Sequence, residues 1–147
     1  MLPKIATIGY EGHTPESFLN LLIKKGVTIL CDVRRNPISR KHGFSKRALA
    51  KSCGVVGIIY QHLSELGIPS EQRRNLNTQE DYDALFAVYK RDCLVRQEKA
   101  LEKIRKWIDS DEAVAIMCYE QNPAKCHRHC VAQCIADQCD GALILHL

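Results

Sequence analysis

The first 33 residues carry the pattern of two buried strands joined by a helix, and this pattern restricts the fold. The apolar run Lys4–Tyr10 ends at closely spaced glycines, and the Thr-Pro pair at 14–15 is typical of a helix start. Val27–Val33 is apolar except for Asp32, as in a strand buried on both faces. A strand–helix–strand unit of this kind has parallel strands. The sequence therefore predicts a three-layer α/β fold, Rossmann-like, with a mostly parallel central sheet.

The rest of the chain continues the alternation of strands and helices. Apolar periodicity predicts helices over 45–52, 81–108 and 124–138, and strands over 58–63, 113–119 and 142–146. A break in the second of these helices is expected around Arg91–Val95. No linker or repeat interrupts the 147 residues, so we expect one α/β domain over 1–147.

Composition favours a cytoplasmic protein with no membrane association. Hydrophobic residues make up 46% and charged residues 26% of the chain, which is typical of globular proteins. No apolar run approaches the roughly 20 residues needed to cross a bilayer, and the N-terminus lacks a signal-peptide pattern. The pattern names no cofactor and no oligomeric state.

Eight cysteines are expected to be reduced thiols, because the chain is larger than most disulfide scaffolds. The sequence contains no C-x-x-C pair, so we predict no metal site. Cys126, Cys130 and Cys134 follow one another at four-residue intervals and would share one stripe of a helix. Whether these three thiols bind a metal stays open.

The segment Ala115–Arg128 reads as a buried strand that passes through a short polar loop into a helix. It brings together a carboxylate, two thiols, an imidazole and a guanidinium, from Glu120, Cys118, Cys126, His127 and Arg128. Such junctions lie at the carboxyl edge of a parallel sheet, where backbone N–H groups and helix dipoles favour anions. We therefore expect an anion site here.

A second feature is a basic run without acidic residues. It contains Arg34, Arg35, Arg40, Lys41, Lys46, Arg47 and Lys51. A cluster of this kind attracts phosphate groups or nucleic acid through its field, although solvated basic faces are also common. With Phe44 and Tyr60 as stacking surfaces, a non-catalytic nucleic-acid-binding module is one open alternative.

Several short motifs resemble those of a known family. They are Gly9-Tyr10-Glu11-Gly12, Asp32-Val33-Arg34 with Pro37, Ser39 and Arg40, Gly43-Phe44-Ser45-Lys46, Tyr60-Gln61-His62-Leu63, Leu66-Gly67, Cys118-Tyr119-Glu120 and Cys126-His127-Arg128. In this order they are similar to the domain of unknown function 488 family of bacterial and archaeal proteins. The resemblance implies little about activity, because the activity of that family is not established.

The predicted sheet brings candidate catalytic residues to one edge. If the strands before Glu11, Arg34 and Glu120 are parallel neighbours, these side chains share one cleft, and His62 lies near it. Glu11 and Glu120 are candidate general acid and base, assisted by His62. The predicted ligand-binding residues are Tyr10, Arg34, Ser39, Arg40, Lys46, Cys126, His127 and Arg128. The ligand would be a small anion or a nucleotide, and nucleic acid is a further possible partner. Alternatively, the two glutamates only form ion pairs with Arg34 and Arg128.

Cysteine chemistry is the remaining alternative. A strand that ends in Cys118 is similar to the arrangement in rhodaneses and cysteine-dependent phosphatases. The phosphatase pattern places an arginine six positions after the cysteine, but Ala124 stands there, and 119–123 contains no glycine to help backbone amides surround the thiol. Sulfur transfer stays open, and so does a nucleophilic role for Cys126.

Overall fold

The structure is a computed structural model that describes residues 5–139 and 142–147. Five parallel strands form one sheet in the order β3-β2-β4-β1-β5. The strands are β1 (Ile5–Gly9), β2 (Ile29–Asp32), β3 (Ile59–His62), β4 (Val114–Cys118) and β5 (Ile144–His146). The α-helices are α1 (Pro15–Lys24), α2 (Lys46–Val55), α3 (Gln79–Val88), α4 (Glu98–Asp109) and α5 (Arg128–Gln138).

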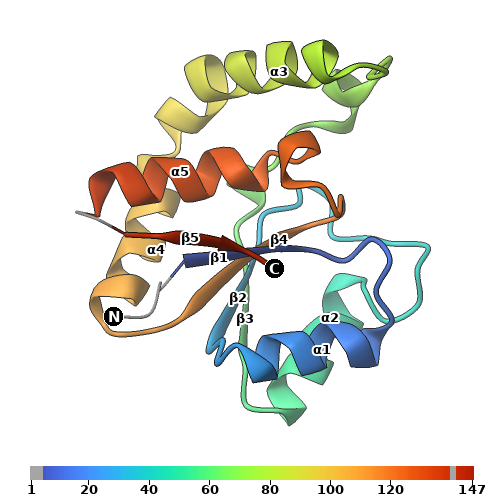
Figure 1. The fold of residues 1–147 in the computed structure, drawn as a ribbon, viewed down its shortest axis with the longest axis vertical. Helices are drawn as coiled ribbons and strands as arrows, with labels where there is room; N and C mark the ends of the chain where they lie inside the picture. Colours follow the sequence, from blue (N-terminus) through green and yellow to red (C-terminus); the bar gives the residue numbers. More distant parts are fainter. Residues whose placement is uncertain (1–4, 140–141) are drawn as a thin grey trace.

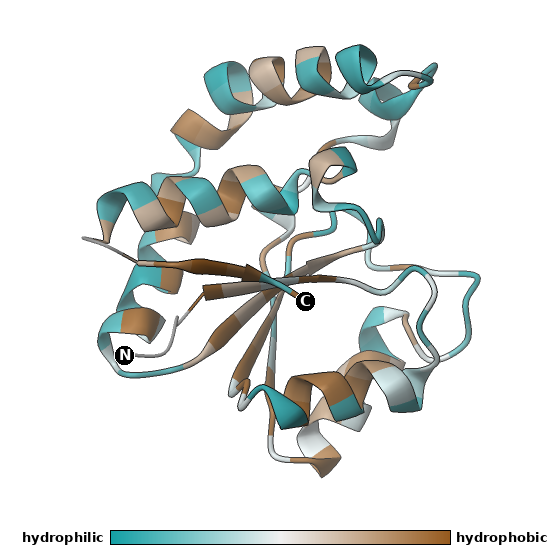
Figure 2. Cartoon of the chain, in the orientation of Figure 1, coloured by the Kyte–Doolittle hydropathy of each residue, from teal (hydrophilic) through white to brown (hydrophobic). Residues whose placement is uncertain are grey.

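Helices cover both faces of the sheet, which confirms the predicted three-layer α/β fold. Helices α1 and α2 lie on one face, α4 and α5 lie on the other, and α3 lies outside α5 (Figure 1). The strands carry the most apolar sequence, and the helices turn polar side chains outward (Figure 2). None of the helices in residues 5–139 and 142–147 is long and apolar enough to cross a membrane.

A hydroxyl side chain precedes each of the first two helices, but only the first one caps its helix. Thr14 caps α1 in a capping box, in which its hydroxyl accepts from the Ser17 N–H and the Ser17 hydroxyl accepts from the Thr14 N–H. Ser45 precedes α2 but makes no side-chain cap. Its hydroxyl instead bonds both the N–H and the carbonyl of Ser39, which closes the preceding loop.

The central strands set the register of the site. All residues of β2 and β4 are buried. Gly9 lies opposite Cys118, and Asp32 lies opposite Met117, so β1, β2 and β4 end together. The chain segments that follow these three strands therefore emerge at one edge of the sheet, as the sequence predicts.

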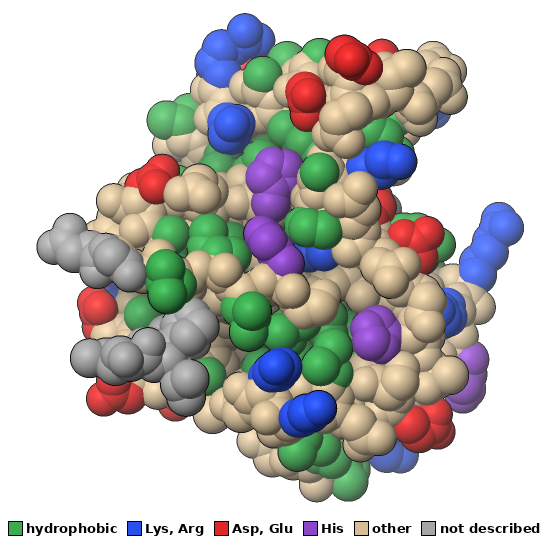
Figure 3. Space-filling view, viewed as in Figure 1, with side chains coloured by type: hydrophobic (Ala, Val, Ile, Leu, Met, Phe, Trp, Pro, Cys, Tyr) green, Lys and Arg blue, Asp and Glu red, His purple; other side chains and the backbone are tan. Residues whose placement is uncertain are grey.

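The edge strand β5 is less covered than the centre of the sheet. Leu143 and Leu145 are 65% and 40% exposed. Apolar side chains reach the surface around this edge between charged groups (Figure 3).

The predicted long helix is divided, as expected, near Arg91–Val95. A π-helical turn at Tyr89–Cys93 and a 3₁₀ turn at Leu94–Arg96 separate α3 from α4. The prediction of one helix over 124–138 is wrong at its start. The Asn122 side chain accepts from the Ala124 N–H and starts a 3₁₀ turn at Pro123–Lys125 (η5). Cys126 is then extended, with φ −135° and ψ 135°, so it does not share a helix stripe with the later cysteines.

Gly9 is required by a close approach of two chain segments. A Cβ atom at this position would lie 1.8 Å from the Glu120 carbonyl oxygen. We expect Gly9→Ala to lower the free energy of unfolding by about 1–3 kcal/mol, because the backbone at Glu120 must move. Urea denaturation measures this loss.

Gly54 provides the control for this substitution. It lies inside α2 with no atom within 4 Å of an added Cβ. Gly54→Ala is expected to stabilise the protein by up to about 1 kcal/mol, because alanine has the higher helix propensity. Equal effects of the two substitutions would contradict the predicted clash at Gly9.

Candidate functional site

A pocket opens at the carboxyl edge of β1, β2 and β4, and we call it the carboxyl-edge pocket. Its volume is about 270 Å³. It is lined by Tyr10, Arg34, Arg35, Asn36, Ile38, Ile68, Ser70, Arg73, Cys118, Tyr119 and Glu120. Three arginines and one glutamate thus surround a space that ends on a cysteine.

Arg34 is held in this pocket by a buried ion pair. Its Nε and Nη2 donate to the two carboxylate oxygens of Asp32 at 2.9 and 2.7 Å. Asp32 is fully buried and Arg34 is 5% exposed. Burial alone would lower the pKa of Arg34, but the hydrogen bonds and charge of Asp32 outweigh it and raise the pKa. The guanidinium stays charged and is fixed in orientation, and Nη1 donates to the Tyr10 hydroxyl at 3.4 Å.

Cys118 ends β4 and has no exposed surface. Its Sγ lies 3.7 Å from His127 Nδ1 and 3.7 Å from Glu120 Oε2. His127 Nε2 lies 2.9 Å from the carbonyl oxygen of Val33. Because a carbonyl only accepts, Nε2 carries the proton, and Nδ1 faces the sulfur.

The surroundings of Cys118 favour its thiolate. A hydrogen bond from the Cys126 thiol is the largest cause, and His127 and Arg73 add to it, so the pKa of Cys118 is well below its ordinary value in spite of burial. The pKa of Cys126 moves the other way, well above its ordinary value, because of burial and the adjacent sulfur. Burial would lower the pKa of His127, but the Cys118 thiolate outweighs this and raises it.

Arg73 lines the pocket beside Glu120. It ends a 3₁₀ turn, Ser70–Arg73 (η2), and its Nη2 lies 2.8 Å from Glu120 Oε1. The two side chains are 28% and 21% exposed, and both contact Cys118. Burial and the nearby Cys118 raise the pKa of Glu120, while Arg73 opposes this rise. The Arg73–Glu120 pair therefore separates the buried sulfur from solvent.

The structure brings only some of the predicted site residues into this pocket. Tyr10, Arg34 and Glu120 line it, and Cys126 and His127 lie directly behind Cys118. The other predicted residues are absent from the lining, and they are Glu11, Ser39, Arg40, Lys46, His62 and Arg128. Their predicted roles as ligand-binding or catalytic groups stay predictions.

Two of these other residues support the backbone around the pocket. Glu11 Oε1 accepts from the Gln121 N–H at 2.9 Å. His62 Nε2 lies 2.8 Å from the Arg34 carbonyl oxygen, and Lys46 Nζ lies 3.4 Å from His62 Nδ1. These contacts hold both walls of the pocket in place.

Arg128 holds the loop after β4. It is fully buried, and its guanidinium donates to the carbonyls of Glu120 and Gln121. Among the residues described, Glu120 pairs with Arg73 and Arg34 pairs with Asp32, so the predicted pairing of the glutamates with Arg34 and Arg128 is wrong.

Several backbone N–H groups of the loop after Cys118 already donate to acceptors within the protein. The N–H groups of Ala124 and Lys125 bond to Asn122, and that of Cys126 bonds to Pro123. The Gln121 N–H bonds to Glu11. These four N–H groups are therefore not free to converge on the Cys118 sulfur, as the amides of a cysteine-dependent phosphatase do.

A family model decides to which family the chain is related. The model described as "Domain of unknown function DUF488" matches residues 14–135. The chain belongs to the DUF488 family. The matched part includes every charged residue that lines the carboxyl-edge pocket, whereas Tyr10 precedes it. Searches of curated proteins and of solved structures found no match.

Two cysteines and one histidine at the inner end of the pocket form a possible metal site in the described part of this DUF488 protein. The donor atoms of Cys118, Cys126 and His127 lie within 4.8 Å of one another. Cysteine and imidazole donors suit Zn²⁺ or Cu⁺. The adjacent Arg73 guanidinium opposes a cation there.

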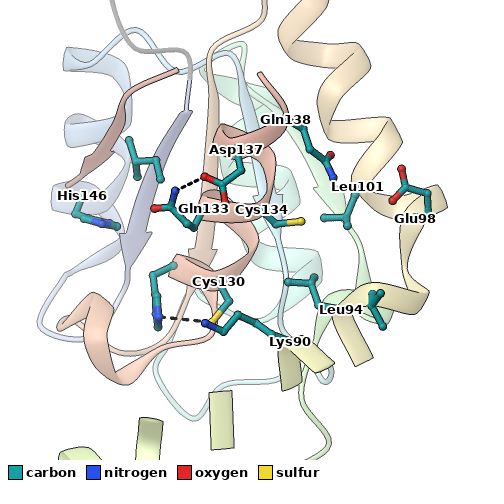
Figure 4. Close-up of a pocket in the computed structure, with 13 residues that line it drawn as sticks. Lys90, Leu94, Glu98, Leu101, Cys130, Gln133, Cys134, Asp137, Gln138 and His146 are labelled. Carbon is teal, nitrogen blue, oxygen red and sulfur yellow. Dashed lines mark hydrogen bonds between the residues drawn. The ribbon is translucent and has the colours of Figure 1, made fainter. Parts of the chain in front are cut away.

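A second, larger cavity of about 490 Å³ lies between α4 and α5 (Figure 4). Cys130 and Cys134 line it together with Leu94 and Leu101. These two thiols therefore face a different space from Cys126, which contacts Cys118.

Four residues on which the site depends are absent from the predicted catalytic and ligand-binding residues. Cys118 appears in the sequence analysis only in the strand-to-helix segment and the cysteine alternative, and Arg35 only in the basic run, whereas Arg73 and Asp32 have no role there. Arg73 lies in a polar stretch that gives no sign of folding over the sheet edge. Asp32 stands two residues before Arg34, and side chains two residues apart on extended chain lie on one side. That spacing is the signal by which the buried pair is predictable.

Proposed function

We propose that this DUF488 protein is a cysteine-dependent enzyme that binds a small anionic substrate in the carboxyl-edge pocket. The observation that carries the proposal is the position of Cys118 Sγ, 3.7 Å from His127 Nδ1, at the inner end of a pocket lined by three arginines. A thiolate is the nucleophilic form of cysteine, and an adjacent imidazole and guanidinium favour it.

The arginines suit an anion in different ways. Arg34 is already neutralised by Asp32, so it supplies a fixed direction more than free charge. Arg35 is exposed and lines the same pocket. Arg73 is bound to Glu120, and an incoming anion can replace that carboxylate on its guanidinium. The bound anion would then lie between Arg73 and the sulfur, in the place that Glu120 leaves.

Glu120 keeps its predicted role as an acid–base group in this proposal. Its Oε2 lies 3.7 Å from the Cys118 sulfur, and burial raises its pKa. Once released from Arg73, it is placed to exchange a proton with a substrate or leaving group. Glu11 and His62 act as positioning residues for the pocket walls.

Alkylation by iodoacetamide, mapped to each cysteine across a pH series, tests the proposal. The thiolate of Cys118 is lost only as pH falls through its lowered pKa, so its labelling should persist at pH values where an ordinary thiol is protonated and slow. Inorganic sulfate or phosphate should slow the labelling of Cys118 and leave Cys139 unchanged. The proposal fails if the labelling of Cys118 falls with decreasing pH over the same range as that of Cys139.

Exposed cations near the start of α2 support a second candidate, the binding of nucleic acid. Arg40, Lys46, Arg47 and Lys51 are all exposed. For this candidate, affinity for a single-stranded oligonucleotide falls steeply with salt concentration. The pair Lys46→Gln and Arg47→Gln should reduce the slope, whereas Lys99→Gln with Lys103→Gln on α4 should not. A flat salt dependence excludes this candidate.

A further inference from the structure

We infer that the group transferred at this site is a sulfur atom, which Cys118 accepts from a small anionic sulfane-sulfur donor and which Cys126 displaces by forming a disulfide with Cys118. The inference rests on the proposed function and adds the substrate class and a role for the second thiol. Thiosulfate is the simplest anion of this class.

The first observation is the second thiol itself. Cys126 and Cys118 are both fully buried, and their sulfurs lie within 4.8 Å of each other. The extended backbone of Cys126, between η5 and α5, brings it to this position in place of the helix. Phosphoryl or acyl transfer through Cys118 needs no second thiol. Thiol–disulfide chemistry requires one.

The second observation is the supply of hydrogen-bond donors. Transfer of a phosphoryl group spreads charge over oxygen atoms, which enzymes stabilise with converging donors. Four backbone N–H groups of the loop after Cys118 already donate to acceptors within the loop or to the Glu11 side chain. Exchange between sulfur atoms keeps its charge on the sulfurs, so it depends less on such donors.

The third observation is the charge of the pocket. Arg34, Arg35 and Arg73 line it, against the single carboxylate of Glu120. The sulfonate end of thiosulfate matches a guanidinium fork, and this places the outer sulfur toward Cys118. A neutral disulfide would gain nothing from these arginines.

The sulfur atom is transferred in two displacement steps. The Cys118 thiolate attacks the outer sulfur of thiosulfate, the S–S bond of the donor breaks, and sulfite leaves with the electron pair. Cys118 then carries a persulfide. Cys126 loses its proton and attacks the inner sulfur, hydrosulfide leaves with the electron pair and the proton, and a Cys118–Cys126 disulfide remains. The transferred sulfur is reduced to sulfide, the two thiols are oxidised, and a small external thiol reduces the disulfide.

Thiosulfate is the probe, and intact mass is the first readout. Cys126→Ser removes the thiol that resolves the persulfide but keeps a hydroxyl that can donate to the Cys118 sulfur, so this variant should gain one sulfur atom, which a thiol reductant removes. The wild-type protein should lose two hydrogen atoms and release sulfide. Cys130→Ser is the matched control, because Cys130 is also buried but lines the other cavity. It should behave like the wild type.

The outcomes distinguish a failure of sulfur transfer from a failure of the proposed function. If Cys118 is alkylated at low pH in both the wild type and Cys126→Ser but Cys126→Ser gains no sulfur, sulfur transfer is overturned and the thiolate proposal stands. If the labelling of Cys118 falls with decreasing pH over the same range as that of Cys139, the proposed function itself is overturned. Stoichiometric Zn²⁺ that protects Cys118 and Cys126 together from alkylation would overturn the inference, because both thiols would then be metal ligands.

Discussion

Replacing Asp32 with asparagine is expected to lower the free energy of unfolding by about 3–5 kcal/mol. Asp32 is fully buried, and its two oxygens accept from Arg34 Nε and Nη2. Without the carboxylate, the guanidinium is a buried charge with no counter-charge. The Tyr60 hydroxyl also loses its charged acceptor. Urea denaturation at neutral pH measures the loss.

Two variants control this experiment. Asp109→Asn removes an exposed carboxylate at the end of α4 and should leave stability nearly unchanged. Adding Arg34→Met to Asp32→Asn removes the buried charge and should recover part of the loss. If Asp32→Asn costs no more than Asp109→Asn, the buried ion pair is not what fixes Arg34 in the pocket.

Replacing His127 with glutamine is expected to slow alkylation of Cys118 at neutral pH by about ten- to a hundred-fold. The amide can still donate to the Val33 carbonyl, as Nε2 does now, but it cannot become a cation beside the sulfur. A nearby opposite charge typically lowers a pKa by about 1–3 units, and each unit changes the thiolate fraction about tenfold below the pKa.

His129 supplies the control for this substitution. It lies two residues further along in α5, and its Nδ1 is 2.6 Å from the Cys126 carbonyl oxygen, away from the Cys118 sulfur. His129→Gln should leave the pH dependence of Cys118 alkylation in place. If both variants shift the profile equally, the effect is structural and the role of His127 in favouring the thiolate is rejected.

The sequence was sufficient to predict the frame of this site. Apolar runs before Tyr10, Arg34 and Tyr119 mark three strands, and the rule that strand–helix–strand units are parallel brings their ends to one edge. That argument correctly groups Arg34 with Glu120. It depends only on periodicity and chain connectivity, which are local properties of the sequence.

The chemistry inside the pocket depends on contacts that the sequence does not encode locally. Arg73 reaches Cys118 and Glu120 from a segment about fifty residues earlier in the chain, which periodicity cannot place. Cys126 was assigned to a helix, because one 3₁₀ turn followed by an extended residue looks the same in sequence as a helix start. That error hid its contact with Cys118 and left the two cysteines as separate features.

The ultraviolet absorbance of thiolate, followed against pH, is the most direct test of the claim that Cys118 is ionised in the folded protein. It needs no reagent to reach the buried sulfur. Cys53 is the matched control, since it is equally buried in the core on the other face and burial raises its pKa to about 11. We predict a thiolate signal at neutral pH in the wild type and in Cys53→Ala, and its loss in Cys118→Ala. A signal that is the same in all three proteins, or absent from the wild type, would contradict the account.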